Sequence, residues 1–409
     1  MGQRVSGEPE AMVRLPLWYG ALTTLLEPIA AGWGQGGDRR ALAARRGFEV
    51  PQGEAWIHAA SVGEASGVAP LVQAWRTRHP EDRLIASALT PGGREALLGS
   101  GDLTVTTPPY ETLAAARRVV RTSGVRRLLL LETEIWPAWL AAAYEAGVRV
   151  AVANARLSDR GWRRYRRWRA ALAPLVSRLT AVAAQTDTDA ARWLELGVAR
   201  ERVAVTGNTK YESAASLTPA SAAERAEARR RLGLEESGLW CVWGSLRPGE
   251  ERWVEEALRA NPPARFLVVP RHPELWRARR RPGEDSGRAV WLLSLGVLRD
   301  AYRAGDFAVM GGTLEPYGGH NAVEPAALGL PVLLGPSTAN LRDAATALIQ
   351  AGGATAVSDA VALGRAIVCL CTHADARAKA ARAARQTATD LAGAAARVLA
   401  HLEARGFWA

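Results

Sequence analysis

The stretch FAVMGGTLEPYGGHNAVEPAALGLPVLLGP, residues 307–336, places a glycine-rich segment between two short apolar runs. The runs at 307–310 and 332–334 are continuous rather than alternating, which is typical of parallel strands covered on both faces. Between them, four glycines stand close to a histidine, an asparagine and a glutamate. The stretch therefore predicts a strand, a loop whose backbone comes close to a ligand, a helix and a second parallel strand.

The same alternation of apolar runs and helical stretches continues on both sides of this segment. Other runs of strand length occupy residues 55–60, 84–88, 127–131, 148–153, 179–183, 203–206, 239–243, 266–269 and 290–293. They form two series, separated by residues 213–223, where Ser221 also fits a capping box with Glu224. The pattern predicts an α/β protein with two doubly wound domains that face each other across a cleft, with a site on each wall.

The expected organisation has four segments: residues 1–40, 41–215, 216–385 and a C-terminal helix at 386–409. No signal peptide pattern is present at the start of the sequence. Residues 15–33 are mostly apolar with tryptophans at helical spacing, but Glu27 and two prolines interrupt them. A spanning helix needs about 20 uninterrupted apolar residues. We therefore expect a helix lying in a membrane interface, with packing on the protein's own core as the alternative.

The composition is basic and excludes several classes of protein. The 409 residues contain 52 Lys+Arg against 41 Asp+Glu, and a 48% apolar content excludes a disordered or collagen-like chain. The charge of +11 predicts an anionic partner, which is nucleic acid, a membrane surface or a phosphorylated substrate. Three cysteines match neither a disulfide framework nor a zinc spacing, which favours a reducing compartment such as a cytosol.

Acidic residues follow two of the predicted strands. Glu64, in the segment SVGEASG (61–67), stands near a helix start, where it suits a general base. The alternative is an acidic residue that is simply stabilised by the helix dipole. Glu132 and Glu134 follow the run at 127–131, so that one can point into the cleft and the other into an ion pair. The alternative for this pair is two solvated loop acids.

Donors for a phosphate follow strands of the second series. They are Gly244 and Ser245 after one strand, Arg271 and His272 after the next, and Gly311, Gly312, Gly318, Gly319, His320 and Asn321 in the opening stretch. Glu324 is placed to accept hydrogen bonds from ribose hydroxyls. The sequence contains no Walker motif, no metal-ligand spacing and no G-x-S-x-G elbow.

Two basic features stand apart from these loops. Lys210 is one of only two lysines, and we expect its ammonium to contact an anionic group or a catalytic carboxylate, with chance placement as the alternative. Residues 160–169 combine six arginines, including Arg163 and Arg164, with three aromatics. That helix suits phosphate-bearing lipid or nucleic acid, and the alternative is a solvated face with packed aromatics.

The motifs together resemble the 3-deoxy-D-manno-octulosonic acid (Kdo) transferase family of lipopolysaccharide assembly. The pieces in order are HAASVGE (58–64), ETEIWP (132–137), NARLSDR (154–160), VTGNTKY (205–211), PRHPE (270–274) and GGHNAVEPAALGLPV (318–332). The resemblance implies a GT-B fold with two Rossmann-like domains, an N-terminal one for the acceptor and a C-terminal one for the nucleotide sugar. It also implies CMP-Kdo as donor, a phosphorylated lipid A precursor as acceptor, and an inverting reaction without a metal or other cofactor.

The family's catalytic base matches Glu64, and its second acid matches Glu132 or Glu134. The matching motifs also suggest Ser61, Arg156 and Lys210 as residues that bind the acceptor or an anion, and the arginine-rich stretch at 160–169 adds Arg163 and Arg164. The family's membrane-associated N-terminal segment matches residues 15–33, which implies the cytoplasmic side of the inner membrane. No nucleic acid is expected, because no module signature accompanies the arginines.

Three positions depart from the family pattern. Gly92 removes a hydroxyl from the usual T-P-T-G, residues 293–297 lack the usual Asp and Glu, and Ser337 replaces a bulkier residue. These departures keep open a catalytically silent paralogue that binds anionic lipid at a membrane. A basic nucleic-acid-binding protein is the less favoured alternative.

Overall fold

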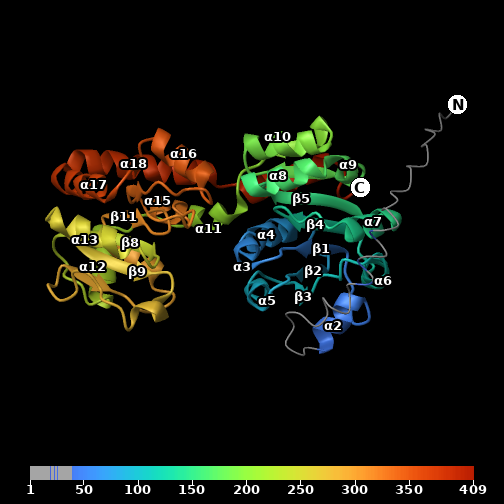
Figure 1. Ribbon diagram of the computed structural model, residues 1–409, viewed down its shortest axis with the longest axis horizontal. Helices are drawn as coiled ribbons and strands as arrows, with labels where there is room; N and C mark the ends of the chain where they lie inside the picture. Colours follow the sequence, from blue (N-terminus) through green and yellow to red (C-terminus); the bar gives the residue numbers. More distant parts are fainter. Residues whose placement is uncertain (1–18, 20–22, 24, 26–38) are drawn as a thin grey trace. The chain divides into compact units, whose positions relative to one another are not determined.

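The computed structural model describes Tyr19, Thr23, Leu25 and residues 39–409, and it divides into two compact units (Figure 1). The N-terminal unit runs to Lys210 and takes up the chain again from Ala394 to Ala409, and the C-terminal unit is Tyr211–Gly393. The chain thus changes unit after residues 210 and 393, where the sequence suggested 215 and 385.

The N-terminal unit is built on a seven-stranded sheet. Its strands are β1 (Ala55–His58), β2 (Leu84–Ser87), β3 (Thr104–Thr106), β4 (Arg127–Leu131), β5 (Arg149–Ala155), β6 (Ala181–Ala184) and β7 (Val203–Val205). Their order is β3-β2-β1-β4-β5-β6-β7, and every neighbouring pair is parallel. The switch in direction between β1 and β4 is the doubly wound topology that the sequence predicted.

Successive residues of these strands enter different cores. Trp56, Leu128 and Leu130 pack in one apolar cluster, whereas Ile57 and Leu129 pack in another. Successive side chains point to opposite faces of the sheet, and helices cover both faces. The runs are therefore continuously apolar. The helices are α2 (Arg39–Arg46), α3 (Val62–Ala65), α4 (Val68–Arg78), α5 (Pro91–Leu98), α6 (Leu113–Ser123), α7 (Pro137–Glu145), α8 (Asp159–Arg167), α9 (Arg169–Val176), α10 (Asp187–Leu196) and α19 (Ala394–Ala404).

The C-terminal unit repeats the arrangement with six parallel strands. They are β8 (Leu239–Leu246), β9 (Ala264–Pro270), β10 (Ala289–Trp291), β11 (Phe307–Met310), β12 (Val332–Leu334) and β13 (Ala354–Ala356), in the order β10-β9-β8-β11-β12-β13. The helices are α11 (Glu212–Ala215), α12 (Ala222–Arg231), α13 (Glu251–Arg259), α14 (Leu298–Ala304), α15 (Val323–Ala327), α16 (Arg342–Gln350), α17 (Ala360–Thr372) and α18 (Ala374–Leu391). Each predicted strand is present, and the predicted capping box of Ser221 and Glu224 is confirmed at the start of α12.

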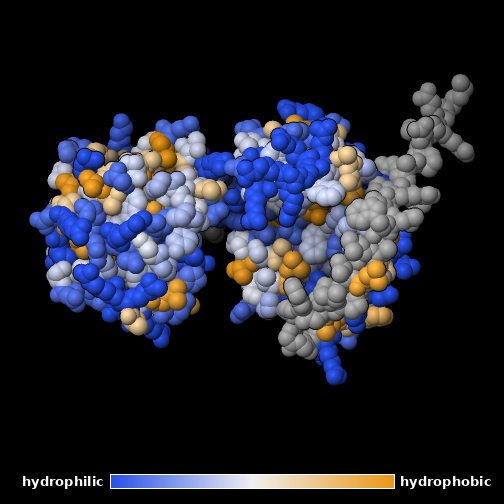
Figure 2. Space-filling model, in the orientation of Figure 1, coloured by the Kyte–Doolittle hydropathy of each residue, from blue (hydrophilic) through white to orange (hydrophobic). Residues whose placement is uncertain are grey.

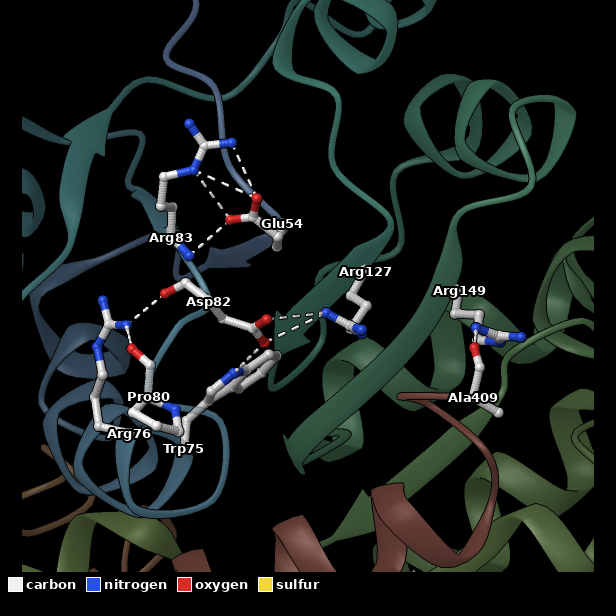
Figure 3. A network of polar contacts seen from close by, with 9 residues as sticks. All are labelled: Glu54, Trp75, Arg76, Pro80, Asp82, Arg83, Arg127, Arg149 and Ala409. Carbon is white, nitrogen blue, oxygen red and sulfur yellow. Dashed lines mark hydrogen bonds and ion pairs between the residues drawn. The ribbon is translucent and has the colours of Figure 1, made fainter.

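A polar network occupies the amino ends of the strands in the N-terminal unit (Figure 3). Asp82 accepts a hydrogen bond of 2.9 Å from the Trp75 indole and lies 3.3 Å from Arg127, at the start of β4. Glu54 pairs with Arg83 at 2.9 Å, beside the starts of β1 and β2. The charged groups at this edge therefore bind one another, and the candidate site lies at the opposite, carboxyl edge.

The predicted interfacial helix at residues 15–33 lies outside the described residues, apart from Tyr19, Thr23 and Leu25. Tyr19 donates a hydrogen bond of 2.8 Å to Glu111. Within the part of the chain that the structure describes, no helix has the length and hydropathy needed to cross a bilayer.

Candidate active site

The acidic candidates and the glycines follow the carboxyl ends of the central strands in each sheet, whereas Lys210 follows the edge strand β7 and Arg163 and Arg164 lie on α8. In doubly wound sheets, ligands bind where the strand order reverses, which is beyond β1 and β4 in one unit and beyond β8 and β11 in the other. The short helix α3 after β1 carries Glu64, and the loop after β4 carries Glu132 and Glu134. The segments that follow β8 and β11 carry the glycines of the predicted donor site. Each unit is described separately below.

Glu64 turns back toward the end of β1. Ser61 caps the short helix α3 with its hydroxyl, which accepts from the Glu64 N–H at 3.4 Å. The Glu64 carboxylate accepts from the Ala60 N–H at 2.7 Å and from the Ser61 hydroxyl at 3.2 Å. The capping turn therefore holds a half-buried carboxylate at the strand end.

The surroundings of Glu64 raise the pKa of its carboxyl group to near neutral pH. Burial and the negative charges of Glu134 and Glu132 raise the pKa of Glu64 to about 7, against the hydrogen bonds from Ala60 and Ser61. A general base works best when its pKa lies near the operating pH. Glu64 is therefore suited to take a proton from a hydroxyl.

Glu134 is held by aromatic and imidazole groups. Its carboxylate accepts from the Trp136 indole N–H at 2.6 Å and lies 3.6 Å from His58 Nε2. His58 is fully buried, and its Nδ1 lies 2.9 Å from the hydroxyl of Ser87 on β2. Burial alone would raise the pKa of Glu134, but the neighbouring His58 imidazole and the Trp136 N–H lower it overall. Glu134 is thus an ionised neighbour of Glu64.

Glu132 forms an ion pair with Lys210. Glu132 has a left-handed backbone conformation with φ of 56°, and its carboxylate accepts from the Lys210 ammonium. The loop that carries Lys210 is fixed by a buried asparagine, because Asn154 Oδ1 accepts from the Thr209 N–H at 3.0 Å. The structure thus places one of the chain's two lysines on a carboxylate of the candidate site.

The loops of the N-terminal unit pack tightly around these acids. A Cβ atom on Gly67 would lie 2.7 Å from Thr209 Oγ1, so only glycine permits this approach. Gly92 lies against the same loop, since a Cβ there would be 3.1 Å from Val62. The Arg156 carbonyl accepts from the Thr133 hydroxyl, which joins the NARLSDR and ETE segments.

The arginine-rich helix lies on the surface and is shorter than the sequence suggested. It forms two helices, α8 and α9, with a break at Trp168. Trp162 and Tyr165 pack against the core, whereas Trp168 is 56% exposed. Arg163 and Arg164 are exposed, as are Arg160, Arg166, Arg167 and Arg169. Figure 2 shows strongly hydrophilic side chains over the region where Figure 1 places α8.

In the C-terminal unit, the ends of β8 and β11 come into close backbone contact. A Cβ atom on Gly311 would lie 2.5 Å from the Ser245 carbonyl oxygen, and one on Gly244 would lie 2.0 Å from the Tyr302 hydroxyl. Ser245 itself is buried with φ of 59°, a conformation that non-glycine residues rarely adopt. Such strain is stored at functional sites more often than elsewhere.

Cationic groups surround this strand edge. Arg247 Nη1 lies 3.2 Å from His272 Nε2, and its guanidinium stacks 4.5 Å from the Tyr317 ring centre. Burial and the charges of Arg271, Arg247 and His272 lower the pKa of His320 to about 4. His320 is therefore neutral near pH 7, and the arginines supply the positive charge that an anion needs.

Glu324 and the last glycines complete the predicted donor loop. Glu324 Oε1 lies 3.4 Å from Arg299 Nε on α14, so the carboxylate proposed for ribose has a cationic partner. Gly318 donates its N–H to the Ser337 hydroxyl at 2.9 Å, and a Cβ on Gly319 would lie 2.1 Å from Leu341. Asn321 accepts from the Val323 N–H at 3.0 Å.

Sequence reasoning missed Glu250 and Arg247, which belong to the same edge. Glu250 is fully buried and its carboxylate reaches residues more than 60 positions away. Its only sequence signal was its place in the G-S-L-R-P-G-E-E segment. Among the described His, Cys, Asp and Glu side chains, no group of three has a geometry that could hold a metal ion.

Comparisons with solved structures show the fold. The chain is similar to a glycosyltransferase from Rickettsia africae ESF-5, with a TM-score of 0.62, 14% identity and coverage of 87% of this chain and 98% of that one. It is also similar to the UDP-GlcNAc 2-epimerase of Neisseria meningitidis, with a TM-score of 0.59, 14% identity and coverage of 86% and 100%. The two parallel sheets therefore form a GT-B architecture of Rossmann-like domains.

Comparisons with characterised sequences identify the family. The family model of 3-deoxy-D-manno-octulosonic-acid transferase (kdotransferase) matches residues 37–213. The transferase of that name from Bordetella pertussis is 34% identical over 384 residues, covering 85% of this chain and 86% of that protein. The one from Haemophilus influenzae is 30% identical over 390 residues, covering 88% and 90%. The chain therefore belongs to the Kdo transferase family, the glycosyltransferases that add Kdo in lipopolysaccharide biosynthesis.

Proposed function

We propose that the protein transfers Kdo from CMP-Kdo to a phosphorylated lipid A precursor, with inversion at the anomeric carbon and without a metal ion. The observation that carries this proposal is Glu64, a half-buried carboxylate whose pKa is raised to about 7 at the carboxyl edge of the first sheet. Membership of the Kdo transferase family supports the transferred sugar.

In the proposed reaction, the Glu64 carboxylate takes the proton of an acceptor sugar hydroxyl. The hydroxyl oxygen then bonds to the anomeric carbon of Kdo while the bond from that carbon to the CMP phosphate oxygen breaks. A single displacement from the opposite face inverts the anomeric carbon. The proton is first held by Glu64 and then passes to solvent. The electron pair of the broken bond leaves with CMP.

Negative charge develops on the leaving phosphate, and the second unit offers donors for it. We assign this role to Arg271, Ser245 and the loop at 311–321, with His320 as a neutral neighbour. The buried Nε2 of His320 has no hydrogen-bond partner among the described residues, which fits a contact with donor substrate. Glu324 would bind the cytidine ribose and exchange Arg299 for ribose hydroxyls.

The remaining cations suit the carboxylate of Kdo and the acceptor phosphates. Lys210 is ion-paired with Glu132 and is positioned by its loop, so it can hold an anion near Glu64. Arg156 carries a guanidinium on the neighbouring loop, beside Thr133. We assign Lys210 to the Kdo carboxylate and Arg156 to the acceptor.

The exposed arginines of α8 and α9 suit the acidic cytoplasmic leaflet of the inner membrane, where the acceptor lies. A basic face with an exposed tryptophan is typical of surface attachment, in which each Lys or Arg contributes about 1 kcal/mol. Replacement of Arg163 and Arg166 by Glu should therefore weaken sedimentation with vesicles containing anionic lipid. If this variant sedimented with the vesicles as well as the unsubstituted protein does, α8 would not be part of the membrane contact.

One assay tests the proposed function directly. The full chain is mixed with CMP-Kdo and a tetraacylated lipid A precursor, and the lipid product is weighed by mass spectrometry. A mass gain of one or more Kdo units supports the proposal and counts the units added. Intact protein that leaves the lipid mass unchanged rules the proposal out, and lipid binding without transfer would instead favour a silent paralogue.

A further inference from the structure

Glu250 connects two separate loops of the C-terminal unit through one buried carboxylate. Oε2 accepts from the N–H of Arg247 at 2.7 Å and from the N–H of Gly312 at 2.9 Å. Oε1 accepts from the N–H of Leu314 at 3.0 Å and from that of Glu315 at 3.4 Å. The loop after β8 and the loop after β11 therefore share a single anionic anchor.

Capping of its own helix does not explain this carboxylate. Glu250 is the N-cap residue of α13, but its side chain makes no capping hydrogen bond to that helix. The carboxylate turns instead toward the loop after β11. It is fully buried, and a buried charge is costly unless hydrogen bonds satisfy it. Four backbone N–H groups meet that requirement here, and burial still raises the pKa of Glu250.

Hydrogen bonds also join the anchored loop to a third loop, the one that follows β12. Thr313, fully buried, lies between the anchored N–H groups of residues 312 and 314, and its hydroxyl accepts from the Gly335 N–H at 2.9 Å. Its carbonyl accepts from the Ser337 N–H at 2.9 Å, and the Ser337 hydroxyl accepts from Gly318. A loss of the Glu250 contacts would therefore remove the anchor of residues 312–315 and weaken the position of the glycine-rich loop at 311–319.

We propose that Glu250 is a positioning residue for the donor nucleotide: it holds the glycine-rich loop in its binding conformation without touching the donor. The inference rests on the proposed function, because it assumes that this loop binds the CMP part of CMP-Kdo. A preorganised loop binds more tightly, since less conformational freedom is lost on binding. Glu250 thus affects donor affinity and leaves acceptor affinity unchanged.

The test compares Glu250→Gln with Glu251→Gln in the full chain. An amide has one acceptor oxygen and a donor NH2, so it leaves two backbone N–H groups facing another donor. Glu251 accepts only from Gly249 among the described contacts, at 2.6 Å, and is the matched control. We expect Glu250→Gln to raise the Kd for CMP in calorimetry, and the KM for CMP-Kdo, about tenfold. The acceptor KM should stay within twofold in both variants.

A folded Glu250→Gln protein that binds CMP as tightly as the unsubstituted protein would overturn the inference. A rise in the acceptor KM equal to that of the donor would also overturn it, because a general loss of structure affects both substrates. If Glu250→Gln does not fold, Glu250→Asp, which keeps the charge but is shorter, is compared on the same terms. Failure of the unsubstituted protein to bind CMP would refute the proposed donor instead.

Discussion

Three carboxylates share the carboxyl edge of the first sheet, and each has different partners. Glu132 binds the Lys210 ammonium, and Glu134 binds Trp136 and faces His58, whereas Glu64 pairs with no cation or imidazole among the residues that the structure describes. These environments raise the pKa of Glu64 and lower that of Glu134, which is how neighbouring carboxylates take different roles. The unpaired acid is the one that can exchange a proton near pH 7.

Replacement of Glu64 by Gln should abolish most transfer while donor binding remains. The amide cannot take the proton, and general base catalysis contributes roughly 10²–10⁴ in rate. We expect kcat to fall by that factor in the mass-spectrometric assay, with an unchanged Kd for CMP. Glu81→Gln, an exposed acid of the same unit, is the control. Full activity of Glu64→Gln would show that another group is the base.

The pH dependence of kcat/KM should report Glu64. The base works in its ionised form, so activity should rise with pH through a midpoint of about 7. In Glu134→Gln a negative neighbour is removed, which stabilises the ionised form of Glu64 and lowers its pKa. The midpoint should therefore move to lower pH in that variant. A midpoint that stays in place, or rises, contradicts the interaction.

At the scale of residues, the sequence predicted the site residues that directly follow strands. It did not predict residues such as Glu250, whose side chain binds a loop distant in the sequence. Glu64, Glu132 and Glu134 each follow an apolar run, so their edge of the sheet could be inferred from position. Glu250 bonds to N–H groups about 60 residues further along the chain, and no local pattern records such a contact.

At the scale of elements, helix starts were readable because capping is local. The Ser221 hydroxyl accepts from the Glu224 N–H at 3.2 Å, and the Glu224 carboxylate accepts from the Ser221 N–H at 2.8 Å. Strands β3 and β13 were not predicted. Each has only three residues and lies at a sheet edge, and the sequences Thr-Val-Thr and Ala-Thr-Ala contain no continuous apolar run.

Removal of the α12 cap gives a stability prediction for one element. Ser221→Ala leaves the Glu224 N–H without its hydroxyl partner, which should lower the free energy of unfolding by about 1 kcal/mol. Denaturant unfolding of the full chain measures this change. Ser237→Ala, at an exposed position outside any helix, should change it by less than about 0.5 kcal/mol. Equal effects in the two variants would contradict the capping assignment.

At the scale of the whole molecule, the last helix belongs to the first unit. Val398, Leu399, Leu402 and Phe407 are fully buried in the same apolar cluster as Ile57 of β1. Arg397 donates a hydrogen bond of 2.9 Å to the Thr206 carbonyl, beside the loop that carries Lys210. The sequence predicted one helix at 386–409, but α18 ends at Leu391 and α19 covers only Ala394–Ala404. Helical periodicity also does not say which sheet a helix covers.

Loss of one side chain from this helix should destabilise the N-terminal unit. Leu402→Ala leaves a cavity in a fully buried site, and such changes cost about 2–5 kcal/mol. Hydrogen exchange should show faster opening of the strands in the first sheet than in the second. Arg405→Ala, at an exposed position on the same end of the chain, is the control. Faster exchange confined to the second sheet would contradict this packing.

Because α19 belongs to the N-terminal unit, that unit is complete only after the whole C-terminal unit has been synthesised. About 180 residues of the other unit are made between Lys210 and Ala394. At roughly 5–20 residues per second, that interval lasts about 9–36 s on the ribosome. Throughout it, the part of the sheet face that packs against Leu399 and Phe407 lacks the cover of α19. The nascent chain therefore exposes this apolar surface until the second unit has been synthesised.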